Sequence, residues 1–239
     1  MIIIPARIGS TRFPNKILAD IGGMPMVIRT AKSVEEIDDI LIATDSVEVV
    51  KIAENYGYKS VLTSSEHQSG TDRIFEAAKK FGLKNNDIVI NVQADEPFIE
   101  EQVVRAVYEL TKKNLDNEKI IMNSCYKLLS SSEADDPNLV KVVISLDGNA
   151  LYFSRAKIPY PRDHHFDEFK GHIGIYGFSM RGLEVFCSLP HSPLERIEKL
   201  EQLRTLYNNY EISMIEVETK SFGIDTQEDL ERALKFHIL

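Results

Sequence analysis

Residues 40–62, ILIATDSVEVVKIAENYGYKSVL, decide the fold class of this chain. The run Ile40–Ala43 is short and apolar, which is typical of a strand buried on both faces. It is followed by helical spacing of apolar residues over 47–56, which ends at Gly57, and by a second short apolar run at 60–62. A strand, a helix and a strand in this order predict two parallel strands joined by a crossover helix.

The same alternation continues on both sides of this stretch. Further strands are expected at 2–4 and 88–92, and further helices at 24–36, 71–81 and 100–113. Four strand-helix units in succession predict a mainly parallel sheet with helices on both faces. Because ligands of such sheets lie beyond the carboxyl ends of the strands, the polar residues that follow the strands are the first candidates for a site.

The second half of the chain has a different pattern. We expect strands at 119–128, 139–145, 150–154, 173–178 and 212–217, and helices at 194–208 and 226–237. Asp147-Gly148 is placed as a hairpin turn, and 158–169 as a proline-bearing loop. Nothing in the composition marks a linker, so the prediction is one α/β domain over 1–239 with an inserted antiparallel β-region.

Composition limits the function classes. The 239 residues carry 28 Lys and Arg against 37 Asp and Glu, and a net charge of −9 argues against nucleic-acid binding. No targeting segment is visible, and no apolar stretch reaches the ~20 residues needed to span a bilayer. The two cysteines, Cys125 and Cys187, have no metal-type spacing and exclude a disulfide framework. We therefore expect a soluble, cytoplasmic protein with no membrane partner.

The first candidate for chemistry is a cationic loop directly after the first strand. Residues 5–16, PARIGSTRFPNK, place Arg7, Arg12 and Lys16 around small polar residues. Guanidinium and ammonium groups form charge-assisted bonds with phosphates, so the loop is a candidate phosphate site. It matches neither GxxxxGK[ST] nor GxGxxG. The alternative is an ordinary solvated loop.

Two segments offer carboxylates. In NVQADEP, residues 91–97, Asp95 and Glu96 follow the fourth strand and suit Mg²⁺, although either could cap the next helix. In FGIDTQED, residues 222–229, Asp225 or Thr226 is an evident helix cap. Only a spatial pairing with Asp95 would make Asp225 a second metal ligand.

Other motifs leave two interpretations open. Ser69 and Thr71 can cap the helix at 71–81, and Arg73 can pair with Asp72 or address a base or phosphate. Arg155 and His172 lie at strand ends, where they could bind an acidic sugar or lie on the surface without a ligand.

Taken together, these strings resemble one family, the 3-deoxy-manno-octulosonate cytidylyltransferases, or CMP-Kdo synthetases. Nine segments match in order from Pro5 to Ala233: PARIGSTRFPNK, ATD, HQSGTDR, NVQADEPFI, NLVKVV, YFSRAKIPY, HIGIYGF, EKLEQLR and GIDTQEDLERA. The resemblance implies a Rossmann-like nucleotidyltransferase fold whose inserted β-region builds a homodimer. It also implies an Mg²⁺-dependent transfer of CMP from CTP to Kdo with release of pyrophosphate, which activates Kdo for lipopolysaccharide assembly.

The resemblance assigns roles residue by residue. Arg7 and Lys16 match positions that hold the CTP phosphates, with Arg12 in the same loop, and Asp95 and Asp225 match the metal-binding carboxylates. Catalysis is thereby assigned to Lys16, Asp95 and Asp225. The remaining matched positions line the nucleotide (Ser69, Thr71 and Arg73) or surround the Kdo carboxylate and hydroxyls (Gln93, Arg155, His172, Tyr176 and Glu201). Residues 1–118 would then mainly bind CTP, and 119–239 would bind the sugar and form the dimer.

One residue departs from the family pattern. Ala94 stands where the family has glycine in its QGDEP string, so Ala94 would be strained if that position needs a positive φ. Two alternatives remain open at this stage. The chain could activate another acidic sugar with CTP, such as 8-amino-Kdo or a sialic acid, or it could be a non-catalytic nucleotide-binding module.

Overall fold

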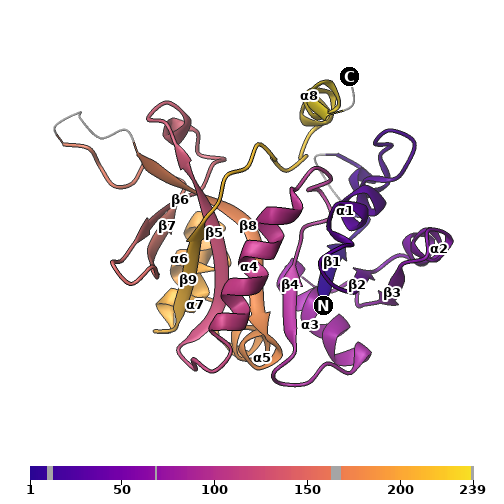
Figure 1. Cartoon of the computed structure of the whole chain (residues 1–239), viewed down its shortest axis with the longest axis horizontal. Coiled ribbons are helices and arrows are strands. Elements are labelled where there is room, and N and C mark those ends of the chain that lie inside the picture. The colour runs from indigo at the N-terminus through magenta and orange to yellow at the C-terminus, as the bar shows by residue number, and fades with distance from the viewer. Residues whose placement is uncertain (10–12, 68, 163–167, 238–239) are drawn as a thin grey trace. The chain divides into compact units, whose positions relative to one another are not determined.

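A computed structural model describes residues 1–9, 13–67, 69–162 and 168–237 of the chain (Figure 1). It divides into two compact units. The first contains Met1–Arg105 and Thr219–Leu239, and the second contains Ala106–Glu218. The C-terminal segment therefore belongs with the N-terminal residues, which places Asp225 in the same unit as Lys16 and Asp95. The expected division of labour between residues 1–118 and 119–239 stays a prediction.

The first unit is built on a parallel sheet with strand order β3-β2-β1-β4. Its strands are β1 (Ile2–Ala6), β2 (Ile40–Thr44), β3 (Lys59–Leu62) and β4 (Ile88–Asn91). All five residues of β1 and all five of β2 are buried, as a parallel strand covered on both faces requires. The strand-helix-strand prediction for residues 40–62 is confirmed.

The first unit also contains helices. They are α1 (Met26–Val34), α2 (Val47–Asn55), α3 (Gly70–Phe81) and the C-terminal α8 (Gln227–His237), with a short 3₁₀ turn, η1 (Lys16–Leu18). Of these, α1, α2 and α3 contact strands of this sheet. The helix α3 contacts β1 and β2, and α2 contacts β3 (Figure 1). The helix α4 (Glu101–Lys113) begins in this unit and ends in the second.

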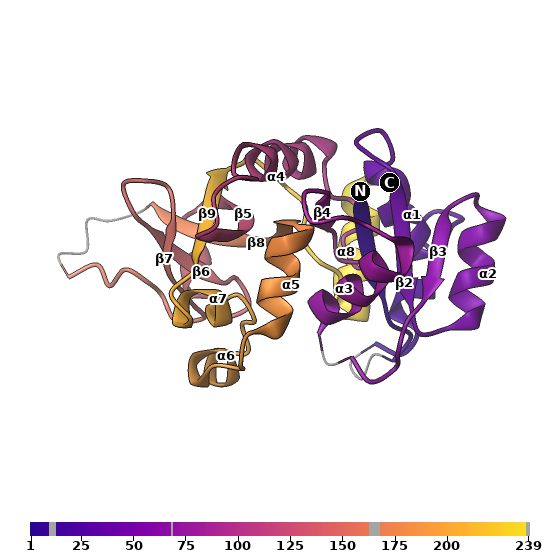
Figure 2. The same cartoon turned by 90° about the horizontal axis from the view of Figure 1, so that it is seen from below.

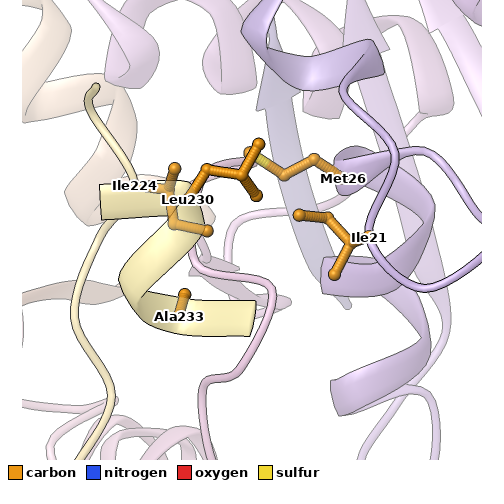
Figure 3. Packing of buried hydrophobic residues seen from close by; sticks show 5 residues of the cluster. All are labelled: Ile21, Met26, Ile224, Leu230 and Ala233. Atoms are coloured by element: carbon orange, nitrogen blue, oxygen red, sulfur yellow. The ribbon is translucent and has the colours of Figure 1, made fainter. Parts of the chain in front are cut away.

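A small apolar cluster fixes the C-terminal segment in the first unit. Figure 3 shows Ile224 and Leu230 beside Ile21 and Met26, with Ala233 one turn further along α8. All five side chains are buried, so their contact removes apolar surface from water and stabilises the position of α8. Asp225 lies directly after Ile224 and is therefore anchored by this cluster.

The second unit carries the β-region expected in the latter half of the sequence. Its strands are β5 (Ile120–Leu129), β6 (Lys141–Ile144), β7 (Ala150–Ser154), β8 (Phe169–Ser179) and β9 (Glu211–Glu216). The β5-β8, β6-β7 and β6-β8 pairs are antiparallel, whereas β5 and β9 are parallel. The predicted turn at Asp147-Gly148 joins β6 to β7, so the insertion is antiparallel apart from β9.

The helices of this unit differ from the sequence prediction. A single helix over 194–208 is wrong, because α6 (Pro193–Glu198) ends at Lys199, which has a left-handed φ of 56°, and α7 (Leu203–Tyr207) starts afresh. The helix α5 (Met180–Ser188) was not expected; it lies along β8 and β5 (Figure 2). Another short turn is η2 (Glu133–Asp135). Among the described residues, none of the helices has the length and apolar composition to cross a bilayer.

Candidate active site

The first unit contains a cavity of about 320 Å³ at the carboxyl ends of its strands. Seven of the residues singled out from the sequence line it: Arg7, Lys16, Ser69, Arg73, Gln93, Asp95 and Asp225. Pro5, Gly9, Ile17, His67, Gly70 and Ala94 complete the wall. The position agrees with the rule that open parallel sheets bind ligands beyond their carboxyl ends.

The ammonium group of Lys16 forms ion pairs with both carboxylates that line this cavity. Its Nζ donates to Asp95 Oδ2 at 2.6 Å and to Asp225 Oδ1 at 2.8 Å. The lysine side chain is 11% exposed. Burial alone would lower the pKa of Lys16, but the carboxylates of Asp95 and Asp225 outweigh it and raise the pKa above its ordinary value. The side chain is therefore a protonated cation that holds both carboxylates.

The cap of α8 explains why Asp225 is available for this contact. Asp229 Oδ2 accepts hydrogen bonds from the amides of Asp225 and Thr226 and from the Thr226 hydroxyl, and the Thr226 hydroxyl accepts from the Asp229 amide. Thr226 and Asp229 thus cap the helix. The sequence left open whether Asp225 serves as the cap, and the structure directs its carboxylate to Lys16 instead.

Arg73 lines the cavity, but its guanidinium is held by the protein. Nη2 donates to Asp45 Oδ2 at 3.0 Å, and Nη1 donates to Thr63 Oγ1 at 2.6 Å. The other oxygen of Asp45 accepts from the Ile8 amide at 3.2 Å. This buried pair therefore ties the start of the cationic loop to the ends of β2 and β3, so Arg73 shapes the wall of the cavity.

The other predicted nucleotide residues have varied placements. Ser69 caps α3, with its hydroxyl oxygen accepting from the Asp72 amide, and Thr71 is buried in the first turn of that helix. Arg7 is exposed on the cavity wall. Arg12 lies outside the described residues.

Gln93 and Ala94 form the wall next to Asp95. The Gln93 amide donates to Asn91 Oδ1 at 3.3 Å. Ala94 is buried and is not among the described non-glycine residues with positive φ, so the condition under which it would be strained is not met. The alanine methyl group is part of the cavity surface.

Two further ionisable groups, His67 and Glu96, lie at this site or next to it in the sequence. His67 lines the cavity, and its Nε2 contacts Glu76 Oε2. Burial alone would raise the pKa of Glu76, but hydrogen bonds from Lys80, the Ser64 amide and His67 lower it to about 2. The sequence left Glu96 open between an Mg²⁺ ligand and a helix cap; in the structure the residue is half-buried, and its carboxyl group accepts a hydrogen bond from the Ser221 hydroxyl. Burial, followed by the charge of Asp95, raises the pKa of Glu96 to about 8. Nothing in the sequence spacing distinguishes either residue from its neighbours.

The remaining predicted residues lie in the second unit. His172 Nε2 lies 2.9 Å from Ser124 Oγ, and the ring centroids of His172 and Tyr176 are 5.4 Å apart. The Tyr176 hydroxyl donates to Gln202 Oε1 at 3.2 Å. Burial and then the charge of Glu201 raise the pKa of Tyr176, which places Glu201 in the same group. These residues form one polar cluster in the second unit, in which Tyr176 and Gln202 are buried and His172 and Glu201 are half-buried.

Arg155 is anchored separately from this cluster. Its Nε donates to the Glu198 carbonyl at 2.8 Å and its Nη1 to the Pro137 carbonyl at 3.1 Å. Its amide donates to Glu198 Oε2. The guanidinium of Arg155 is therefore held by two backbone carbonyls, and its main-chain amide by the carboxylate of Glu198.

Known proteins resemble this chain over nearly its whole length. A family model described as cytidylyltransferase matches residues 1–215. The 3-deoxy-manno-octulosonate cytidylyltransferase of a Nitratiruptor species is 54% identical over 232 residues, which are 97% of each chain. The same-named protein of Wolinella succinogenes is 51% identical and covers 98% of each chain. A solved structure of CMP:2-keto-3-deoxy-manno-octonic acid synthetase complexed with CTP superposes with a TM-score of 0.89 at 37% identity, covering 100% of this chain and 98% of the other.

The His172 environment predicts a pH-dependent stability. Burial lowers the pKa of His172 to about 3, below the ~6.5 of an unfolded chain, so the unfolded state takes up the proton first as the pH falls. The contribution of neutral His172 to the free energy of unfolding is complete above pH ~6.5 and is lost progressively as the pH falls toward ~3.

Lowering the pH from 7.5 to 5.5 should decrease the free energy of unfolding of the unmodified protein. In His172→Gln this decrease should be smaller by about 1 kcal/mol, because glutamine does not titrate. Urea unfolding followed by circular dichroism at both pH values measures this difference. Equal pH dependence in the variant and the unmodified protein would contradict the buried neutral imidazole.

Proposed function

The chain belongs to the cytidylyltransferase family, and we propose that it transfers CMP from CTP to 3-deoxy-manno-octulosonate (Kdo) with release of pyrophosphate. The observation that carries this proposal is the cavity of the first unit, in which one lysine bridges two carboxylates beside Arg7. The matched relatives at 54% and 51% identity carry the name of this activity.

The donor site follows from charge. CTP brings a polyanionic triphosphate, for which Arg7 and Lys16 are the cationic partners on the cavity wall. Attack by the sugar hydroxyl on the α-phosphorus shifts negative charge to the departing pyrophosphate. Lys16 and Arg7 stabilise that charge, so the site acts mainly by positioning and electrostatic stabilisation.

The carboxylates are suited to hold Mg²⁺. Asp95 and Asp225 contact one ammonium nitrogen, so their oxygens lie close enough to share one divalent cation. Among the described residues no group of three His, Cys, Asp or Glu side chains could hold a metal, and Mg²⁺ ordinarily takes one or two carboxylates together with substrate phosphates. When bound, the ion supplies Lewis-acid activation of the attacking hydroxyl.

The acceptor is assigned to residues of the second unit. Arg155 offers a guanidinium for the Kdo carboxylate, while His172, Tyr176 and Glu201 offer polar groups for its hydroxyls. The amide nitrogen of Gln202, buried next to Tyr176, has no hydrogen-bond partner among the described residues and adds a donor. We place the reaction in the cytoplasm, where the unbridged Cys125 and Cys187 stay reduced.

Pyrophosphate release with a panel of nucleotides and acidic sugars tests the proposal. We expect release with CTP and Kdo that exceeds release with 8-amino-Kdo, a sialic acid or other nucleotides. Faster release with another sugar would make that sugar the acceptor. No release of pyrophosphate with any sugar would indicate a non-catalytic nucleotide-binding module.

Asp95→Asn and Asp225→Asn should each lower kcat by about a hundredfold or more, because each removes half of the carboxylate pair. Asp87→Asn, in the loop before β4, is the matched control and should retain full activity. Steady-state rates at saturating Mg²⁺ measure the effect, and near-normal turnover in either site variant would remove that residue from the metal site.

Arg155→Lys should raise the KM for Kdo by roughly ten- to a hundredfold, because an ammonium cannot reproduce the planar fork on a carboxylate. CTP binding measured by calorimetry without sugar should stay unchanged. Weakened CTP binding with an unchanged KM for Kdo would reverse the assignment of donor and acceptor residues.

We further propose that the chain forms a homodimer through the second unit. Leu151 of β7 is 61% exposed, and Leu146 in the preceding turn is fully exposed. Exposed apolar residues gathered on one hairpin are typical of an interaction surface.

Leu151→Asp should shift the protein from dimer to monomer in analytical ultracentrifugation, whereas Leu62→Asp, at an exposed leucine of the first unit, should not. A dimer that persists in Leu151→Asp would exclude this surface.

A further inference from the structure

Asp225 lies at the end of a segment that has no helix or strand to position it. Residues 217–225 carry neither element, and α8 begins only at Gln227. The apolar cluster around Ile224 fixes the segment at one end. The distance between the Asp225 and Asp95 carboxylates therefore depends on side-chain contacts along 219–225.

Two glutamates that follow Asp95 provide these contacts. Glu100 accepts from the Thr219 hydroxyl and, at 2.9 Å, from the Lys220 amide. Glu96 Oε2 accepts from the Ser221 hydroxyl at 3.2 Å. The Ile224 amide completes the series by donating to the Asp95 carbonyl at 2.9 Å. The segments 95–100 and 219–224 are thus joined at four points.

Among these ties, the one at Glu96 is the side-chain contact nearest to the two catalytic carboxylates. An added Cβ on Gly223 would lie only 3.3 Å from Glu96 Oε1, so glycine at this position lets the backbone approach the carboxyl group closely. Phe98, two residues after Glu96, and Phe222, directly after Ser221, pack on the same apolar cluster as Ile224. One carboxyl oxygen of Glu96, Oε2, therefore accepts from the Ser221 hydroxyl, and the other, Oε1, lies against the backbone of Gly223.

We propose that Glu96 is a positioning residue for the transfer reaction, which holds the Ser221–Gly223 backbone so that Asp225 faces Asp95 across Lys16. It does this without touching substrate. The inference rests on the proposed function for its catalytic consequence and on the contacts alone for its structural one. Small displacements of a catalytic group cost up to about a hundredfold in rate, so loss of this tie affects turnover.

The experiment compares Glu96→Ala, Glu96→Gln and Ser221→Ala with Glu101→Ala, an exposed glutamate of α4 that pairs with Arg105. Glu96→Ala should lower kcat ten- to a hundredfold while the KM for CTP changes less than about threefold, because Arg7 and Lys16 are untouched. Glu96→Gln keeps an acceptor oxygen for Ser221 and should recover kcat to within about threefold of the unmodified enzyme. Glu101→Ala should match the unmodified enzyme.

Hydrogen exchange of the peptide covering 219–226 is the second readout and does not depend on activity. Faster exchange in Glu96→Ala but not in Glu101→Ala is expected. Unchanged exchange, an unchanged kcat, or no recovery in Glu96→Gln would each overturn the proposal. If Glu96→Ala does not fold, Ser221→Ala takes its place, and its kcat should be about three- to tenfold lower than that of the unmodified enzyme. An unchanged kcat in Ser221→Ala would overturn the proposal.

The two proposals fail separately. Should the unmodified protein release no pyrophosphate with CTP and any sugar, the proposed function fails, and hydrogen exchange still decides whether Glu96 orders the Asp225 segment.

Discussion

The site is held together by the charge balance between Lys16 and its two carboxylates. A buried ammonium group requires partners, and two carboxylates so close together repel each other unless a cation lies between them. The contacts of 2.6 Å and 2.8 Å from Nζ meet both requirements at once. Three segments must therefore converge on one point: the end of the cationic loop, the end of β4 and the start of α8.

The fold of the first unit is arranged to allow this convergence. The parallel strands β1 and β4 deliver the loop and Asp95 to the same edge of the sheet. The C-terminal segment is fixed by Ile224 and Leu230 against Ile21 and Met26 (Figure 3). Hydrogen bonds to the carboxyl groups of Glu96 and Glu100 hold the stretch that precedes Asp225 in register.

The sequence predicts much of this fold and less of its site. The strands of the first unit follow from apolar runs such as Ile40–Ala43, because a parallel strand is buried on both faces. The break at Lys199 was missed because apolar spacing is similar before and after a left-handed residue. Lys16 contacts Asp225, which is 209 positions away, and no periodic pattern in the sequence predicts a contact over that separation. The environment of Glu96 likewise depends on tertiary packing of distant segments.

Asp95 and Asp225 form one cation site, which Lys16 occupies. Thermal unfolding of Lys16→Ala, with and without Mg²⁺ and in the absence of nucleotide, measures whether they do. Removing the ammonium leaves two facing carboxylates, so the variant should have a lower Tm than the unmodified protein, and Mg²⁺ should raise its Tm by several degrees more. An equal response of Tm to Mg²⁺ in both proteins would mean that the two carboxylates do not share a cation.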